Sequence, residues 1–230
     1  ILATFSLYFF LREYDLKISY STFYCLSFAT LCYPVSGTPF AYLHAYIFSL
    51  LAILCFLIAI KKRNNFLWFL FPYVCFFAFL SMQTPTAYIL VILFFYLVLY
   101  FVKSREFNNL IFFLSGSVSC IILFLVFLYL TKTPLNNFFY QYILFPLTIG
   151  EGRITSKEVA YISLIDQLNF KRLVGEFKFI HIFLVPLIIL SIKFFKRNNE
   201  DLNLLNSVVV LSAIAFLFNQ IITANQIYIF

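Results

Sequence analysis

Polar side chains that interrupt apolar runs are the residues of this sequence that could do chemistry. In chain order they are His44, Gln83, Thr84, Asn219, Gln220, Thr223 and Gln226. The spacing of Asn219, Thr223 and Gln226 is i, i+4, i+7, which places them on one face of a helix. Polar groups in apolar segments either line a watery cavity, where they can bind a substrate, or hydrogen-bond between helices. Both interpretations are open for these residues.

A second polar group lies in "FFYQYILFPLTIGEGRI", residues 138–154. A break in this apolar stretch is indicated by Pro146, Gly150 and Gly152. An Arg at a membrane surface is suited to a phosphate, because its planar fork makes paired, charge-assisted hydrogen bonds. Arg153 and Gln141 are therefore candidate substrate-binding residues, and Glu151, the acid nearest the break, is a candidate catalytic base. The alternative is that these residues lie in a solvated loop and have no binding or catalytic role.

The composition identifies an integral membrane protein. Hydrophobic residues make up 63% of the chain and charged residues 11%, whereas an average soluble domain is about a quarter charged. The net charge is +7, and the Lys and Arg residues that carry it lie in short clusters between apolar runs, so nucleic-acid binding is not expected. No zinc-ligand spacing, P-loop, GxSxG or dinucleotide motif is present. The sequence thus identifies no cofactor, and the use of a divalent metal ion is left open.

Apolar runs predict the fold class. They cover residues 18–33, 40–60, 66–80, 86–102, 110–130, 179–195 and 204–222, with 1–11 as a partial run. Backbone amides in hydrocarbon must pair within their own segment, so each run should be a helix. We predict an all-α, polytopic transmembrane bundle with about seven full spans. Because the first and last runs are incomplete, we expect residues 1–230 to be a fragment of one transmembrane domain, with both ends missing.

The connectors predict the orientation of the bundle. Basic charge is dense at 12–17, 61–65, 103–109 and 193–203, and sparse at 34–39, 81–85 and 131–178. The two kinds alternate without exception, and basic connectors face the cytoplasm. The polar residues near the other helix ends, His181 among them, are therefore expected on the outer side.

The long outer loop, residues 131–178, carries amphipathic patterns. Thr155 and Glu158 fit a helix capping box. Behind them come two stripes with i, i+3, i+4, i+7 spacing: Tyr161, Leu164, Ile165, Leu168, and Phe170, Leu173, Val174, Phe177. These patterns predict interfacial helices that could roof a site at the membrane surface. A plain amphipathic connector is the alternative.

Three stretches, residues 33–90, 138–154 and 219–230, resemble a known family. They are similar to bacterial polytopic GT-C glycosyltransferases of the dolichyl-phosphate-mannose-protein mannosyltransferase type. Members commonly carry a Lys-Gln-Thr-like stretch after a short helical hairpin. Here the matching place reads Met82, Gln83, Thr84, so Met82 stands where the family has Lys.

The resemblance implies transfer of a sugar from a polyprenyl-phosphate donor to a glycan, lipid or protein acceptor. The reaction would take place on the outer face of a bacterial cytoplasmic membrane. In the family the catalytic acid lies in the first outer loop, which would be upstream of residue 1.

Two other functions stay open. An O-antigen or polysaccharide polymerase or ligase would also use an outer loop with Arg153, Arg172 and nearby His181. A transporter would show internal repeats and Gly- or Pro-broken helices.

The predicted orientation can be tested by labelling. In a cysteine-free version, single cysteines would be placed at Asn64 and, separately, at Lys157. An impermeant thiol reagent on intact cells should label the cysteine at 157 and leave the cysteine at 64 unmodified, because 61–65 is a basic, cytoplasmic connector. Labelling at 64 would overturn the assignment of every loop.

Overall fold

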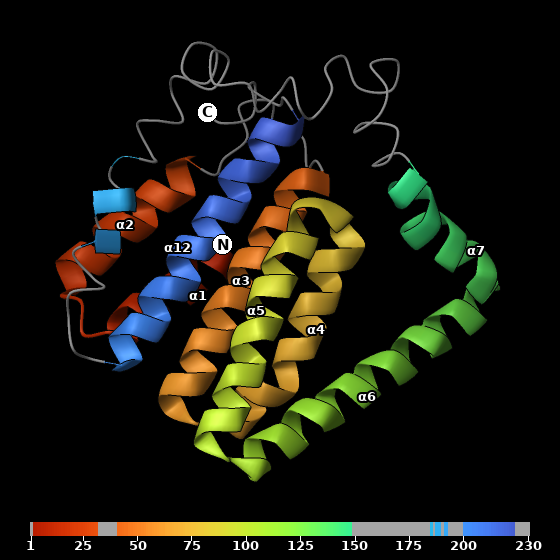
Figure 1. Cartoon of the computed structure of the whole chain (residues 1–230), viewed down its shortest axis with the longest axis horizontal. Coiled ribbons are helices and arrows are strands. Elements are labelled where there is room, and N and C mark those ends of the chain that lie inside the picture. The colour runs from red at the N-terminus through yellow and green to blue at the C-terminus, as the bar shows by residue number, and fades with distance from the viewer. Residues whose placement is uncertain are drawn as a thin grey trace. The chain divides into compact units, whose positions relative to one another are not determined.

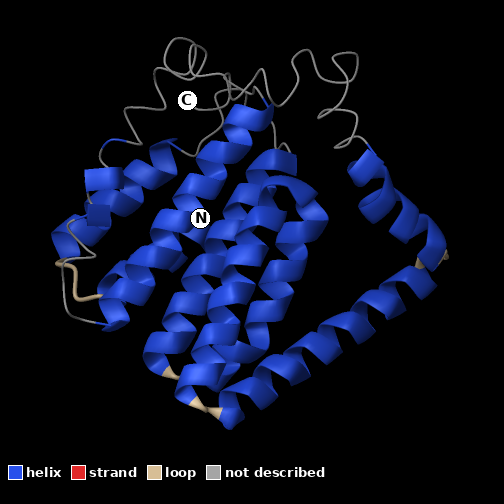
Figure 2. Cartoon of the chain, in the orientation of Figure 1, coloured by secondary structure: helices blue, strands red, loops and turns tan. Residues whose placement is uncertain are grey.

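The computed structural model describes residues 2–31, 41–148, 185, 187–189, 191–192 and 200–223. Every regular element in these residues is helical, which confirms the all-α prediction (Figure 2). The chain divides into two compact units, residues 1–122 and 123–230. Each unit is described by itself.

The helices follow the apolar runs closely (Figure 1). They are α1 (Leu2–Glu13), α2 (Ile18–Leu31), α3 (Ala41–Lys62), α4 (Asn65–Ser81), α5 (Gln83–Ser104) and α6 (Phe107–Leu130), the last of which continues into the second unit. The helix bounds fall within a few residues of the runs, because charged and polar connectors end both the apolar pattern and the helix. For the predicted span 179–195, the residues that the structure describes are helical.

Three of the described helices are long and apolar enough to cross a membrane. They comprise Leu43–Lys62 of α3, and the whole of α5 and α6. At 1.5 Å per residue, the roughly 20 residues of such a helix match a hydrocarbon core of about 30 Å. The apolar helix α4 is 17 residues long, and the apolar part of α12, Asn203–Asn219, is of similar length. These helices point to an integral membrane protein.

Helix α3 is at the centre of the first unit. It packs against α1, α4 and α5. Its buried side chains include small residues that permit close helix approach, among them Ala45, Ser49, Ala52 and Ala59. Large side chains fill the remaining space around Trp68 of α4, which is fully buried. The Trp68 ring stacks on Tyr100 at 5.3 Å and meets Phe56 edge-on at 6.0 Å.

Helix α6 meets α4 at a point of very close approach. Gly116 of α6 lies against the backbone of Phe69, so that a Cβ on Gly116 would come within 2.9 Å of the Phe69 carbonyl carbon. Only glycine fits such a backbone approach. One turn further on, the Tyr73 hydroxyl and the Ser119 hydroxyl are hydrogen-bonded at 2.6 Å. The crossing of α4 and α6 is thus fixed by a missing side chain and by one polar pair.

The second unit contains α7 (Leu135–Phe139), the π-helix η1 (Tyr140–Leu144) and α12 (Glu200–Thr223). Of the break predicted at Pro146, Gly150 and Gly152, the proline does not interrupt the helical structure, which continues to Thr148. Proline lacks an N–H and crowds the carbonyl four residues earlier. In the preceding wide turn the Phe145 N–H bonds to the Tyr140 carbonyl, five residues back. Gly150 and Gly152 lie outside the described residues.

The contact at Gly116 predicts the effect of a single methyl group. Gly116→Ala should lower the free energy of unfolding by about 1 to 3 kcal/mol, because the added Cβ forces α6 away from α4. The fluorescence of Trp68, the only tryptophan in the sequence, reports unfolding on heating in detergent.

The matched control is Ser115→Ala on the exposed side of the same helix, where no close contact is created. This variant should unfold within about 0.5 kcal/mol of the wild type. Equal unfolding temperatures for Gly116→Ala and the wild type would contradict the close approach.

Candidate functional site

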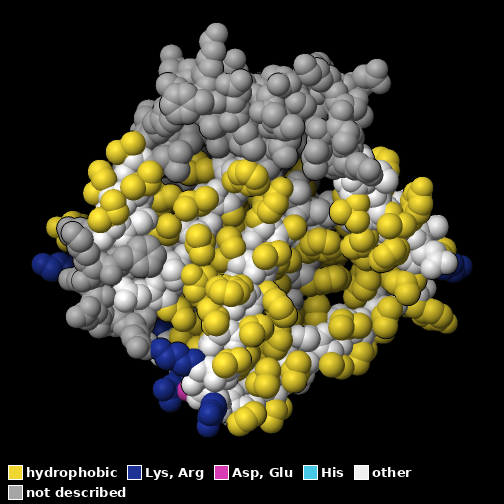
Figure 3. Space-filling view, viewed as in Figure 1, with side chains coloured by type: hydrophobic (Ala, Val, Ile, Leu, Met, Phe, Trp, Pro, Cys, Tyr) yellow, Lys and Arg dark blue, Asp and Glu magenta, His cyan; other side chains and the backbone are white. Residues whose placement is uncertain are grey.

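The two ends of the first unit differ in charge. All Lys, Arg, Asp and Glu residues between 1 and 122 lie in the connectors 12–17, 61–65 and 103–109. These are seven basic and three acidic side chains, a net charge of +4. Figure 3 shows a dark blue group of Lys and Arg side chains at the lower end of the helices, below an apolar surface. We call this group of connectors the basic end.

Glu106 links two connectors of the basic end. Its carboxylate pairs with the Arg63 guanidinium at 3.1 Å and accepts a hydrogen bond from the Tyr100 hydroxyl at 2.6 Å. The Asn109 side-chain amide donates to the same oxygen as Tyr100. The Glu106 side chain is 20% exposed, so most of its lone pairs are satisfied by protein. This network ties the α3–α4 connector to the α5–α6 connector.

The α1–α2 connector lies at the same end. The Glu13 carboxylate pairs with the Lys62 ammonium at 2.6 Å, and Lys61 donates to the Glu13 carbonyl. The Lys61 ammonium also lies over the Tyr14 ring, 4.2 Å from its centre. The three basic connectors of this unit therefore share one end, as their alternation along the sequence predicted.

The opposite end contains the α4–α5 turn, "MQTP", and carries polar groups without charge. Met82 and Thr84 have extended backbone conformations, and the residue before a proline is held in this region by the ring of Pro85. The Thr84–Pro85 peptide bond is cis. Pro85 is buried, whereas the side chains of Gln83 and Thr84 are partly exposed. The turn thus presents two hydrogen-bonding side chains at the end of the helices.

A buried hydroxyl pair holds this turn against α3. The Thr86 hydroxyl lies 3.3 Å from the Ser49 hydroxyl and 3.2 Å from the Ala78 carbonyl oxygen. The side chains of Ser49 and Thr86 are fully buried. In an apolar interior each hydroxyl needs such a partner. The pair fixes the register of the turn relative to the first turns of α3.

His44 belongs to the same end as the turn. It lies on α3 five residues before Ser49, which is about 7.5 Å along the helix axis, and its side chain is exposed. The pair formed by Ser49 and Thr86 therefore brings the end of α3 that carries His44 to the turn that carries Gln83 and Thr84. Three residues predicted as substrate-binding thus lie at one uncharged end of the first unit. We call them the outer polar group, after the orientation that the connectors predict.

The second unit contains further predicted residues. Gln141 is exposed on η1, and Asn219 on α12 is 99% buried. The helix extends to Thr223, so Asn219, Gln220 and Thr223 lie on one continuous helix, as the predicted stripe requires. Their proximity to the outer polar group stays a prediction. Outside the described residues lie Glu151, Arg153, His181, Gln226 and both stripes of 155–178.

Sequence reasoning did not select Ser49, Thr86, Glu106 or Ser212. Ser49 and Thr86 are small hydroxyl residues within apolar runs, where a hydroxyl often bonds its own helix. A signal for Glu106 was present, since it is the single acid of the connector 103–109. Ser212, seven residues before Asn219, is buried on the same helix face and extends the polar stripe.

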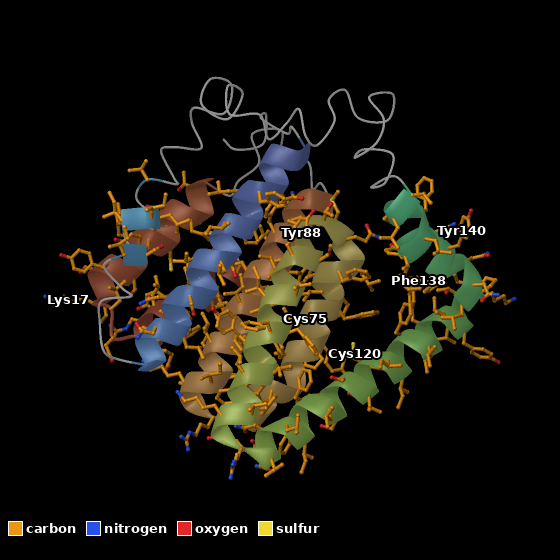
Figure 4. All side chains as sticks on the ribbon, viewed as in Figure 1. Lys17, Cys75, Tyr88, Cys120, Phe138 and Tyr140 are labelled. Atoms are coloured by element: carbon orange, nitrogen blue, oxygen red, sulfur yellow. The ribbon has the colours of Figure 1, made fainter. Side chains whose placement is uncertain are left out.

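An apolar groove of about 340 Å³ lies between α4, α5 and the first part of α6. It is lined by Phe71, Pro72, Cys75, Phe76, Phe79, Leu90, Leu93, Phe94, Leu97 and Phe113. Figure 4 labels Cys75 on α4 in this region. No lining side chain is charged, so the groove provides contact with apolar chains rather than catalytic groups.

Among the residues that the structure describes, no group of three or more His, Cys, Asp or Glu side chains is arranged to hold a metal ion. No protein family, no curated protein and no solved structure matches the chain.

The Glu106 network predicts a marked effect of its removal. Glu106→Ala should lower the free energy of unfolding by about 1 to 3 kcal/mol, because Tyr100 and Asn109 lose their acceptor. Glu106→Gln keeps an acceptor oxygen in a side chain of the same size, so its free energy of unfolding should fall by less than that of Glu106→Ala. Unfolding would be followed by Trp68 fluorescence, since this ring stacks on Tyr100.

The control for this prediction is Glu13→Ala. Its surface pair with Lys62 should contribute at most about 1 kcal/mol. The central role of Glu106 would be disproved if Glu13→Ala were the more destabilising substitution.

Proposed function

We propose that this chain is a bacterial membrane glycosyltransferase. It would move a sugar from a polyprenyl-phosphate donor to an acceptor on the outer face of the cytoplasmic membrane. The observation that carries the proposal is the separation of polar groups in the first unit. Charge lies at the basic end, and the outer polar group lies at the other end beside apolar helices.

This separation fits a lipid-linked substrate. A polyprenyl-phosphate sugar keeps its tail in hydrocarbon and presents its phosphate and reactive carbon at the membrane surface. An enzyme for such a donor needs hydrogen-bonding groups at the ends of apolar helices. His44, Gln83 and Thr84 supply such groups, and their side chains are exposed or partly exposed. The resemblance of residues 33–90, 138–154 and 219–230 to GT-C glycosyltransferases supports the same assignment.

The proposed reaction is a substitution at the anomeric carbon of the donor sugar. An acceptor hydroxyl attacks this carbon, the bond from the carbon to the phosphate oxygen breaks, and polyprenyl phosphate leaves. A base takes the hydroxyl proton. Glu151 is the candidate for this base within the chain. The outer polar group would bind the phosphate and orient the sugar.

The proposal can be tested with the full-length protein in proteoliposomes. Supplied with a radiolabelled polyprenyl-phosphate sugar and a membrane extract as acceptor source, it should release polyprenyl phosphate and label an acceptor. The double substitution Gln83→Ala, Thr84→Val should reduce transfer by about tenfold to a hundredfold, because hydrogen bonds to a charged phosphate contribute about 1.5 to 3 kcal/mol.

The control is Ser81→Ala in the same turn, because this hydroxyl bonds to the Phe77 carbonyl of its own helix. Its transfer rate should equal that of the wild type. No transfer by the wild type, together with reaction of a polyprenyl-diphosphate oligosaccharide, would replace the proposal with a polymerase or ligase. Full transfer by the double variant would remove Gln83 and Thr84 from the site.

A further inference from the structure

The groove between α4, α5 and α6 lies at a definite depth relative to the basic end. Its first lining residue on α4, Phe71, is six residues from Asn65, which is about 9 Å along the helix. On α6, Phe113 is also six residues from the helix start. Half of a hydrocarbon core is about 15 Å thick. The groove therefore starts at the depth of the acyl chains in the leaflet that adjoins the basic end.

The groove alone cannot select a ligand in a membrane. A lipid chain leaves an equally apolar environment when it enters the groove, so there is no hydrophobic driving force, and only contact between surfaces is gained. Selectivity must come from the headgroup. The size of about 340 Å³ is at the lower end for ligand pockets, which suits part of one chain.

The connectors at this end of the groove are positively charged. The α3–α4 connector leads into α4, the α5–α6 connector joins two helices that line the groove, and together these connectors hold five basic side chains and one acid. Arg63 remains 76% exposed although it pairs with Glu106, and Arg105 is exposed at the C-cap of α5. Guanidinium groups at the membrane surface fit a phosphate through paired hydrogen bonds. Basic groups next to an interhelical groove bind anionic lipid headgroups.

We infer that this chain binds one anionic phospholipid from the leaflet at the basic end, with its phosphate on Arg63 and Arg105 and one acyl chain in the groove. The lipid occupies the end opposite to the outer polar group. The inference is therefore independent of the proposed function, and a result for one leaves the other untouched.

The test uses native mass spectrometry of the full-length protein in detergent, with added dioleoyl phosphatidylglycerol or dioleoyl phosphatidylcholine. These lipids share their acyl chains and differ in headgroup charge. Phosphatidylglycerol should bind at least about fivefold more tightly than phosphatidylcholine. In the double variant Arg63→Gln, Arg105→Gln, the preference for phosphatidylglycerol over phosphatidylcholine should fall to less than about twofold.

The matched control is Arg12→Gln, Lys17→Gln, which removes the same number of positive charges from the α1–α2 connector. Its connector joins α1 and α2, which do not line the groove, so the preference should persist. Equal loss in both double variants would reduce the effect to general surface charge and overturn the inference. Equal binding of the two lipids by the wild type would overturn it as well.

The acyl chain in the groove has its own test. Cys75→Phe, or Leu90→Phe if the first variant does not fold, should weaken phosphatidylglycerol binding severalfold while all charges remain. Trp68 fluorescence confirms folding of each variant. If a folded groove variant binds phosphatidylglycerol as tightly as the wild type, the acyl chain of the lipid lies outside the groove.

Discussion

An ionised side chain in hydrocarbon costs several kcal/mol, and this constraint decides where every charge of the first unit lies. The three basic connectors gather at one end, where water and lipid headgroups solvate them. Their acids then serve as links between connectors. Glu106 is the strongest example, because it satisfies Arg63, Tyr100 and Asn109 together and so joins two helix hairpins. The α3–α4 connector is thereby tied to the α5–α6 connector.

Within the bundle, apolar side chains alone do not explain why the helices associate, because lipid is equally apolar. Association instead depends on close contact and on a few polar pairs. Alanines of α3 and Gly116 of α6 let backbones approach. The rings around Trp68 interlock, and the hydroxyls of Ser49 and Thr86 satisfy one another in the interior. The Ser49–Thr86 pair also holds the "MQTP" turn against α3.

The two ends of the unit thus offer different chemistry. The basic end holds charge that pairs with acids and can meet anionic headgroups. The opposite end presents uncharged hydrogen-bonding side chains, which suits a substrate whose own phosphate brings the charge. A phosphate at that end would meet donors without competing carboxylates, since no Asp or Glu lies there within residues 1–122. The two proposals therefore concern opposite ends of the same unit.

The sequence by itself determined the described helices and the end to which the connectors 12–17, 61–65, 81–85 and 103–109 of the first unit belong. Backbone pairing in hydrocarbon is local, so apolar runs such as 86–102 specify helices, and short connectors alternate between two ends. The local rule that proline ends a helix did not hold at Pro146, where helical structure continues after a π-helical turn. Only the tertiary structure decided that Thr86 meets Ser49, that Gly116 meets Phe69, and where the groove forms. Those contacts depend on how each helix is rotated and crosses its neighbours, which is set by side chains far apart in the sequence and not by the spacing within one segment.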